Sequence, residues 1–296
     1  MKLSVVLGTY NRLDQVQRCI ESIVRETRTP TKIYITDAGS TDGTVEYLQS
    51  IASETIIPVL VGKKLGQAKA YNDVFDIVDT KYVCWLSDDN EVVDGGLDCA
   101  VEILEGNSAI GMVALKTTDV QGPFVDAPYI GGISSIGILN VNQGVLPTKV
   151  MKQVGGFSEE FRDYGIDSAL TAEVLHSNYD VVYTKQIALH HYRNWSEDPR
   201  SENYQWLQAR QIAMRERYEK TYGADGGQEQ GAYRLKKELA KRLKTSLTTS
   251  RVGRSLRNSA FARTSINVLS GRYISLFDPI LTLGRKYHLV QSRGKN

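Results

Sequence analysis

Two adjacent carboxylates, Asp88 and Asp89, are the residues of this sequence best suited to chemistry. They follow a short apolar run at residues 82–86 and precede an amide, Asn90. Such a run predicts a buried strand, and ligands of open α/β sheets bind at the carboxyl ends of the strands. Paired carboxylates there suit a ribose, or Mg²⁺ or Mn²⁺, which prefer oxygen ligands and share their shell with substrate phosphates. The alternative is an Asp-Asp-Asn turn that only ends the strand.

Polar side chains also follow two earlier apolar runs. Thr9, Tyr10 and Asn11 come after the first run, and Asp37 comes directly after the second. If these runs are parallel neighbours in one sheet, their polar ends meet at the same edge. A nucleotide bound at that edge would find partners for its base, its ribose and its phosphates.

The elements that must position these residues alternate between strand and helix patterns. The predicted strands are residues 3–7, 33–36, 56–61 and 82–86, and the predicted helices are residues 14–25, 44–51 and 66–78. This alternation predicts an α/β fold with a Rossmann-like, mostly parallel sheet flanked by helices. Neither G-x-G-x-x-G after the first strand nor G-x-x-x-x-G-K-[ST] occurs, so a dinucleotide site and a P-loop are not supported. A metal held by carboxylates remains the economical way to neutralise a diphosphate.

Several segments resemble, in order and spacing, the family 2 glycosyltransferases of GT-A fold. Those similar to the nucleotide-binding half are LSVVLGTYNR (3–12), ITDAGSTDGT (35–44), LGQAKAYN (65–72) and WLSDDN (85–90), and VGGFSEEF (154–161) resembles the acceptor-side motif. The resemblance covers about residues 1–222. It implies one GT-A domain with a nucleotide-sugar-binding half at 1–115 and an acceptor-side half at 116–222.

The resemblance also implies roles for the polar strand ends. Thr9, Tyr10 and Asn11 would lie beside the nucleotide base, Asp37 would hydrogen-bond it, and Asp88 would hold the ribose. The family often has a second acid where this chain has Ala38. That departure weakens the implied base contacts.

The metal site that the resemblance implies contains Asp89 and a histidine. Asp89 would bind the Mn²⁺ or Mg²⁺ that bridges the two phosphates, and His190 or His191 would close the site. Neighbouring side chains of a strand point to opposite faces, so only one of the two histidines can face the metal, and the sequence does not choose between them. Ser87 stands where a D-x-D pattern has its first carboxylate, which predicts weak metal binding until the diphosphate arrives.

Asp167 determines the type of reaction. It precedes a helical pattern at residues 168–176. From spacing alone it would be a helix N-cap, for which Asp is among the best residues. The resemblance instead implies the catalytic base, a carboxylate that takes the proton of an acceptor hydroxyl. Asp163 is the near competitor for that role.

The C-terminal part of the chain differs in charge from the rest. Residues 232–296 contain 15 Lys and Arg against two acids, Glu238 and Asp278, although the whole chain has a net charge of only +2. Residues 223–231 (GADGGQEQG) form a plausible linker, and leucines at four-residue spacing predict a basic amphipathic helix beyond it. Such a helix suits either peripheral binding to an anionic membrane or packing on the preceding domain.

These observations predict an inverting, divalent-metal-dependent glycosyltransferase. It would move a sugar from a nucleotide-diphosphate donor, with a UDP-sugar favoured, to a hydroxyl of a glycan or lipid-linked glycan in polysaccharide or glycan assembly. The alternative is a non-catalytic sugar-nucleotide or glycan-binding module on the same fold. Nucleotidyltransferase chemistry is disfavoured because no glycine-rich loop with a lysine follows the first strand, and no nucleic-acid partner is expected.

The expected location is cytoplasmic, with peripheral attachment to the inner face of a membrane through residues 232–296. The three cysteines, Cys19, Cys84 and Cys99, have neither paired nor metal-type spacing, which fits a reducing compartment. No stretch reaches the length of a membrane span.

Overall fold

The structure is a computed structural model that describes residues 1–121, 125, 128–133, 139–192, 200–222 and 242. The predicted linker at 223–231 lies outside the described residues, and so does the basic extension at 232–296 apart from residue 242. No helix in the described ranges is long and apolar enough to cross a membrane.

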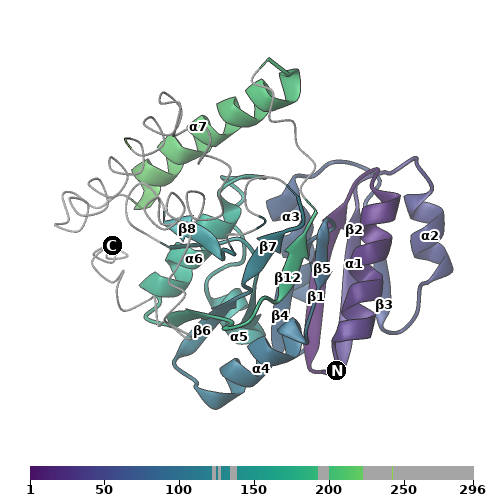
Figure 1. The fold of residues 1–296 in the computed structure, drawn as a ribbon, viewed down its shortest axis with the longest axis horizontal. Helices are drawn as coiled ribbons and strands as arrows, with labels where there is room; N and C mark the ends of the chain where they lie inside the picture. Colours follow the sequence, from purple (N-terminus) through teal and green to yellow (C-terminus); the bar gives the residue numbers. More distant parts are fainter. Residues whose placement is uncertain (122–124, 126–127, 134–138, 193–199, 223–241, 243–296) are drawn as a thin grey trace, which may run out of the picture.

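Strands and helices alternate along the first half of the chain, as the apolar runs predict (Figure 1). Apart from the partly exposed edge strand at residues 56–60, the strands are largely buried and read as continuous apolar runs, as expected for parallel strands covered by helices. In chain order the elements are β1 (Leu3–Thr9), α1 (Leu13–Glu26), β2 (Thr31–Asp37), α2 (Thr44–Ser50), β3 (Ile56–Leu60), α3 (Gln67–Ile77), β4 (Tyr82–Ser87), α4 (Gly96–Gly106) and β6 (Ile110–Ala114). The predicted α/β class is therefore confirmed.

The seven-stranded main sheet has the order β11-β6-β10-β4-β1-β2-β3. Strands β4, β1, β2 and β3 are parallel, and β11 (Asp180–Tyr183) is parallel to β6. Strand β10 (Gly144–Pro147) lies between β4 and β6 and is antiparallel to both. The late strands β10 and β11 therefore complete a sheet that the first half of the chain begins.

A second, three-stranded sheet lies next to the carboxyl end of β4. It contains β5 (Asn90–Val92), β12 (Leu189–His191) and β7 (Thr117–Asp119), with β12 in the middle, antiparallel to β5 and parallel to β7. Strands β8 (Gly131–Ile133) and β9 (Leu139–Val141) form a separate hairpin-like pair. His190 and His191 are the last two residues of β12.

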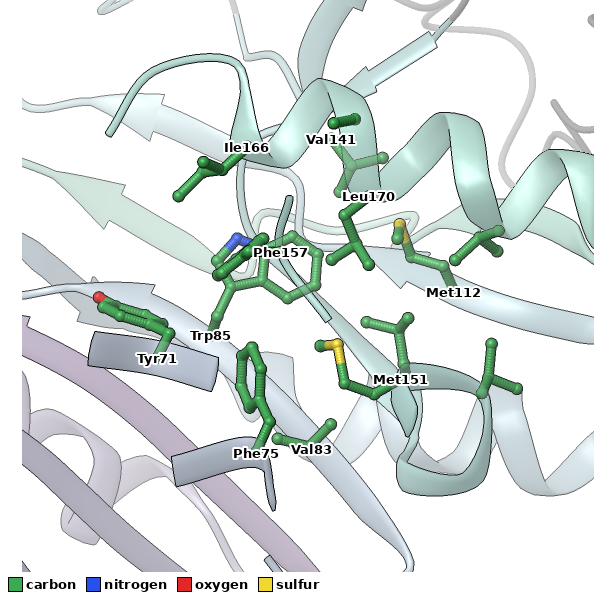
Figure 2. Close-up of a cluster of buried hydrophobic side chains, with 14 of the residues drawn as sticks. Tyr71, Phe75, Val83, Trp85, Met112, Val141, Met151, Phe157, Ile166 and Leu170 are labelled. Carbon is green, nitrogen blue, oxygen red and sulfur yellow. The ribbon is translucent and has the colours of Figure 1, made fainter. Parts of the chain in front are cut away.

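Two apolar cores cover the two faces of the main sheet. One joins β1 and β4 to α1, α2 and α4, and the other joins the opposite face to α3, α5 (Thr148–Gln153) and α6 (Ile166–His176). Figure 2 shows the second core, in which Phe157 packs among Tyr71, Phe75 and Trp85. Helix α7 (Glu202–Tyr222) adds Tyr218 and Tyr222 against Phe161 at its edge.

Ile166, the first residue of α6, is buried in this second core above Trp85 and Phe157 (Figure 2). Burying a side chain of this size stabilises the fold by about 2 kcal/mol. The packing of Ile166 therefore fixes the amino end of α6, and with it the position of Asp167.

Candidate active site

The site begins where β1 and β4 end side by side. The two strands pair in parallel, with Gly8 opposite Ser87, so the segments that follow them are adjacent. Arg12 reaches across from the first segment, and its Nη1 donates to Asp88 Oδ1 at 2.9 Å and to Asp89 Oδ2 at 3.4 Å. One guanidinium thus bridges both carboxylates of the pair.

The pKa values of Asp88 and Asp89 are shifted in opposite directions. Burial raises the pKa of Asp88 to about 6, and the neighbouring Asp89 carboxylate adds to this, although Arg12 and the Thr9 side chain oppose it. Burial would also raise the pKa of Asp89, but His191 and Arg12 outweigh it, and the pKa of Asp89 is lowered. Asp89 is therefore the carboxylate held firmly ionised at this strand end.

His191 faces Asp89 from the middle strand of the small sheet. Its Nε2 lies 3.5 Å from Asp89 Oδ1, and its Nδ1 lies 3.1 Å from Asp119 Oδ1. The Tyr129 hydroxyl donates to the same Asp119 oxygen at 2.7 Å. Both ring nitrogens of His191 are thus directed at carboxylates, one of them in the pair at the end of β4.

His190 points to the other face of the same strand. Its Nδ1 lies 3.7 Å from Glu91 Oε2, and its side chain is 39% exposed, against 18% for His191. Of the two candidate histidines, the structure therefore brings His191 and not His190 to Asp89.

The remaining predicted nucleotide contacts lie in the loops after β1 and β2. Asn11 joins these loops, because its amide nitrogen donates to Ser40 Oγ and its side-chain oxygen accepts from the Thr41 amide, both at 2.8 Å. Asp37 accepts from the Gly39 and Ser40 amides and from the Ser40 hydroxyl, so its carboxylate orders its own loop. A substrate base would have to compete with these bonds for Asp37.

Tyr10 lies at the surface between these loops and the loop before α3. Its ring is 40% exposed, and Lys64 Nζ lies 3.7 Å from the ring centroid. A half-exposed aromatic face beside a cation is able to stack on a planar base.

Asp167 is the second residue of α6. Gly165, with φ of +82°, occupies the N-cap position, so the alternative of Asp167 as the N-cap is wrong. Burial raises the pKa of Asp167 to about 6, partly offset by backbone amides and by the Asn140 side chain. In the part of the chain that the structure describes, no ion pair or hydrogen bond joins Asp167 to Asp88 or Asp89.

The loop before α6 contains Asp163 and Tyr164, which contact other parts of the domain. Asp163, the competitor for the role of base, accepts from the Gln67 amide at the start of α3 at 2.8 Å and pairs with Arg210 of α7. It therefore caps a helix and holds α7. Burial raises the pKa of the neighbouring Tyr164, while the charges of Arg210 and Arg12 oppose it.

The Gly-Gly-Phe motif fastens the acceptor-side loop to α3. The Asn72 side chain accepts from the Phe157 amide and donates to its carbonyl, both at 2.8 Å. A Cβ on Gly156, whose φ is +69°, would lie 2.5 Å from Asn72 Oδ1, so only glycine fits this approach. The motif thus acts through backbone geometry.

The residues present fit a divalent ion between Asp89 and His191. Asp89 Oδ1 is buried, has no hydrogen-bond partner among the described residues, and faces an imidazole nitrogen. The described residues contain no group of three or more His, Cys, Asp or Glu side chains arranged to hold a metal. Mg²⁺-type ions bind through one or two protein ligands and complete their shell with phosphates and water, so a two-ligand site is chemically reasonable.

Three residues of the site carry no predicted role. Arg12 stands next to Asn11 in the sequence, and its position just after β1 could have indicated that it lies at the site. Asp119 and Tyr129 are distant from the other site residues in sequence. Asp119 meets His191 through the pairing of β7 with β12, and Tyr129 is brought there by an isolated bridge to Thr117 of β7. That pairing involves three-residue strands, which carry no clear periodicity.

Residues 4–133 match the family model described as glycosyl transferase family 2. Among curated proteins, an uncharacterized glycosyltransferase of Nostoc sp., alr2836, is 29% identical over 38% of this chain and 36% of its own. The uncharacterized glycosyltransferase YibD of Escherichia coli is 34% identical over 31% of this chain and 27% of its own. The match thus spans about a third of each relative.

Solved structures share the fold over nearly all of the chain. S. aureus TarS in complex with UDP-GlcNAc has a TM-score of 0.56 at 17% identity, over 91% of this chain and 79% of that one. The mannosyltransferase PcManGT from Pyrobaculum calidifontis, in complex with GDP-Man and Mn²⁺, has a TM-score of 0.53 at 15% identity, over 90% of this chain and 86% of that one. The predicted GT-A fold is confirmed.

Proposed function

Because residues 4–133 match the family model described as glycosyl transferase family 2, we propose that the protein is an inverting, divalent-metal-dependent glycosyltransferase. The donor is a nucleotide-diphosphate sugar, with a UDP-sugar favoured, and the acceptor is a hydroxyl of a glycan or lipid-linked glycan. The observation that carries the proposal is the unpartnered Asp89 oxygen facing His191 at the carboxyl end of β4. The solved structures of like fold hold UDP-GlcNAc in one case and GDP-Man with Mn²⁺ in the other.

Asp88, Thr9, Tyr10, Asn11 and Asp37 form the proposed nucleotide subsite. Asp88 holds the ribose hydroxyls, and its pKa of about 6 leaves it largely ionised at neutral pH. Asp89 and His191 hold the ion, Mn²⁺ or Mg²⁺, which when bound neutralises the departing diphosphate. Arg12, already against both acids, is placed to reorient toward the same phosphates.

Asp167 is the proposed general base. It takes the proton from the acceptor hydroxyl while that oxygen attacks the anomeric carbon and the bond from that carbon to the phosphate oxygen breaks. A single displacement of this kind inverts the anomeric centre. The pKa of about 6 suits the role, because the carboxylate is ionised at neutral pH and yet basic enough to accept a proton in the transition state.

The test is a panel of UDP- and GDP-sugars, each with Mn²⁺, Mg²⁺ or chelator. The correct donor should raise the melting temperature only with metal, because a ligand that binds the native state stabilises it by mass action. The same donor should release nucleoside diphosphate slowly to water and faster with an acceptor. Stabilisation without any release, across donors and acceptors, would instead favour a non-catalytic sugar-nucleotide-binding module.

The basic extension at 232–296 is proposed to attach the enzyme to an anionic membrane, where a lipid-linked acceptor would be found. Its support is the excess of 15 basic over 2 acidic residues, each basic residue near the surface contributing about 1 kcal/mol. Co-sedimentation with anionic and neutral vesicles, for the full chain and for a chain ending at Tyr222, tests this. Equal sedimentation of the two proteins would leave the extension as a packing or oligomerisation element.

A further inference from the structure

The pairing of β7 with β12 places a buried carboxylate behind His191. The two strands are parallel, and Asp119 is the register partner of His191. The Asp119 side chain is 0% exposed, in contrast to the 15% exposure of Asp89 on the other side of the ring. A fully buried carboxylate is costly unless it is hydrogen-bonded, so its contacts define its role.

Those contacts determine which nitrogen of His191 carries the proton. A carboxylate only accepts hydrogen bonds, so the Tyr129 hydroxyl at 2.7 Å and His191 Nδ1 at 3.1 Å both donate to Asp119 Oδ1. When a metal ion replaces the proton on Nε2, the imidazole keeps its proton on Nδ1 and presents a lone pair at Nε2. Nε2 lies 3.5 Å from Asp89 Oδ1, which is long for a hydrogen bond.

We propose that Asp119, supported by Tyr129, is the positioning residue that holds His191 with the Nε2 lone pair toward a divalent ion shared with Asp89. The inference rests on the proposed function, since it assumes that metal-assisted transfer occurs at this site. A histidine that ligates a metal generally donates its other N–H to a carboxylate, which fixes the ring and raises its basicity. Asp119 and Tyr129 occupy that place here, although neither touches the ion.

The opposite face of β12 supplies a matched control. His190 and Glu91 form a second histidine–carboxylate pair, 3.7 Å apart, on the same strand and its neighbour β5. The pair does not face Asp89. Glu91→Gln and His190→Ala therefore change the same residue types in the same small sheet without altering the proposed ligand set.

The experiment measures Mn²⁺ binding to the full chain with UDP present, by the electron paramagnetic resonance of free Mn²⁺, and nitrogen coordination by spin-echo modulation of bound Mn²⁺. Asp119→Asn should weaken Mn²⁺ binding about 10- to 100-fold, as loss of a carboxylate behind a metal-bound histidine typically does, and should reduce the imidazole signal. Tyr129→Phe, which keeps the carboxylate, should weaken binding several-fold. His191→Ala should abolish the imidazole signal, and the two control variants should leave both readouts unchanged.

Unchanged Mn²⁺ affinity and imidazole signal in Asp119→Asn and Tyr129→Phe, while His191→Ala loses the signal, would overturn the inference and leave the proposed function intact. If His191→Ala and Asp89→Ala also left Mn²⁺ binding unchanged, the metal site of the proposed function would itself be wrong. Should Asp119→Asn fail to fold, Tyr129→Phe alone decides, because it removes a hydroxyl that contacts Asp119 and His191 Nδ1 and removes no buried charge.

Discussion

Asp89 and Asp167 are both largely buried acids, and their surroundings shift their pKa values in opposite directions. Asp89 lies between Arg12 and His191, whose charges lower its pKa despite burial. No cationic side chain among the described residues is paired with Asp167, and burial raises its pKa to about 6. Pairs of acids whose environments separate their pKa values generally divide the chemistry between them. Here the paired acid is suited to holding a cation, and the isolated acid is suited to exchanging a proton.

The largest expected effect is the loss of sugar transfer in the variant Asp167→Asn. The amide keeps the shape of the carboxylate but cannot take a proton, so turnover with acceptor should fall about 10²- to 10⁴-fold, while metal-dependent donor binding is retained. Single-turnover transfer and donor binding measure the two separately. Asp163→Asn is the matched control, since that acid caps α3 and pairs with Arg210. Turnover that survives in Asp167→Asn but not in Asp163→Asn would reverse the assignment.

Asp89→Asn tests the other member of the comparison. Removing one electrostatic stabiliser of developing charge costs about 10²- to 10³-fold in turnover. Both transfer and donor hydrolysis should fall, because the departing diphosphate is common to them, and the remaining activity should no longer respond to Mn²⁺. Hydrolysis with and without chelator is the measurement. Wild-type activity in chelator would rule out the metal role.

The same substitution of Asp167 should stabilise the protein at neutral pH. Its folded-state pKa, about 6, lies above the ordinary 3.8, so the wild type loses stability as pH rises between these values and stays lower above them. Asp167→Asn avoids this loss and should be more stable at pH 7.5 by about 3 kcal/mol, since each tenfold change in proton affinity is worth about 1.4 kcal/mol. Urea unfolding of both proteins at pH 7.5 and pH 4.5 checks this. An advantage that does not shrink at pH 4.5 would have another cause.

Arg12→Gln should have the smallest effect, and it should lower the stability of the folded protein where Asp167→Asn raises it. Without the guanidinium, Asp88 and Asp89 repel each other, and stability at pH 7.5 should fall by up to about 1 kcal/mol, a modest value because the Arg12 side chain is 42% exposed. The loss should shrink as pH falls and Asp88, whose pKa is about 6, is protonated. Urea unfolding without metal measures it. If the loss were the same at pH 7.5 and pH 4.5, Arg12 would stabilise the fold through packing rather than charge.

The acids of the comparison could be predicted from sequence because each follows a recognisable local pattern. The buried run of β4 ends at Asp88 and Asp89, and the alternation of side chains along a strand limits the histidines to one. What could not be predicted depends on short elements. Strand β10 contains only four residues and ends on a proline, and Asp119 reaches His191 through strands of three residues. At these lengths neither periodicity nor composition predicts a partner.

The antiparallel strand β10 also determines when the domain can assemble. Until Gly144–Pro147 is in place, nothing in the main sheet joins β6 to β4, and both strands present unpaired edges. The segment that matches the family model ends at residue 133, before this strand. During synthesis the nascent chain must therefore hold an incomplete sheet until β10 leaves the ribosome, a stage at which exposed edges favour aggregation. A fragment cut at the family boundary would remain at that stage permanently, so the unit that folds is longer than the unit that the family comparison matches.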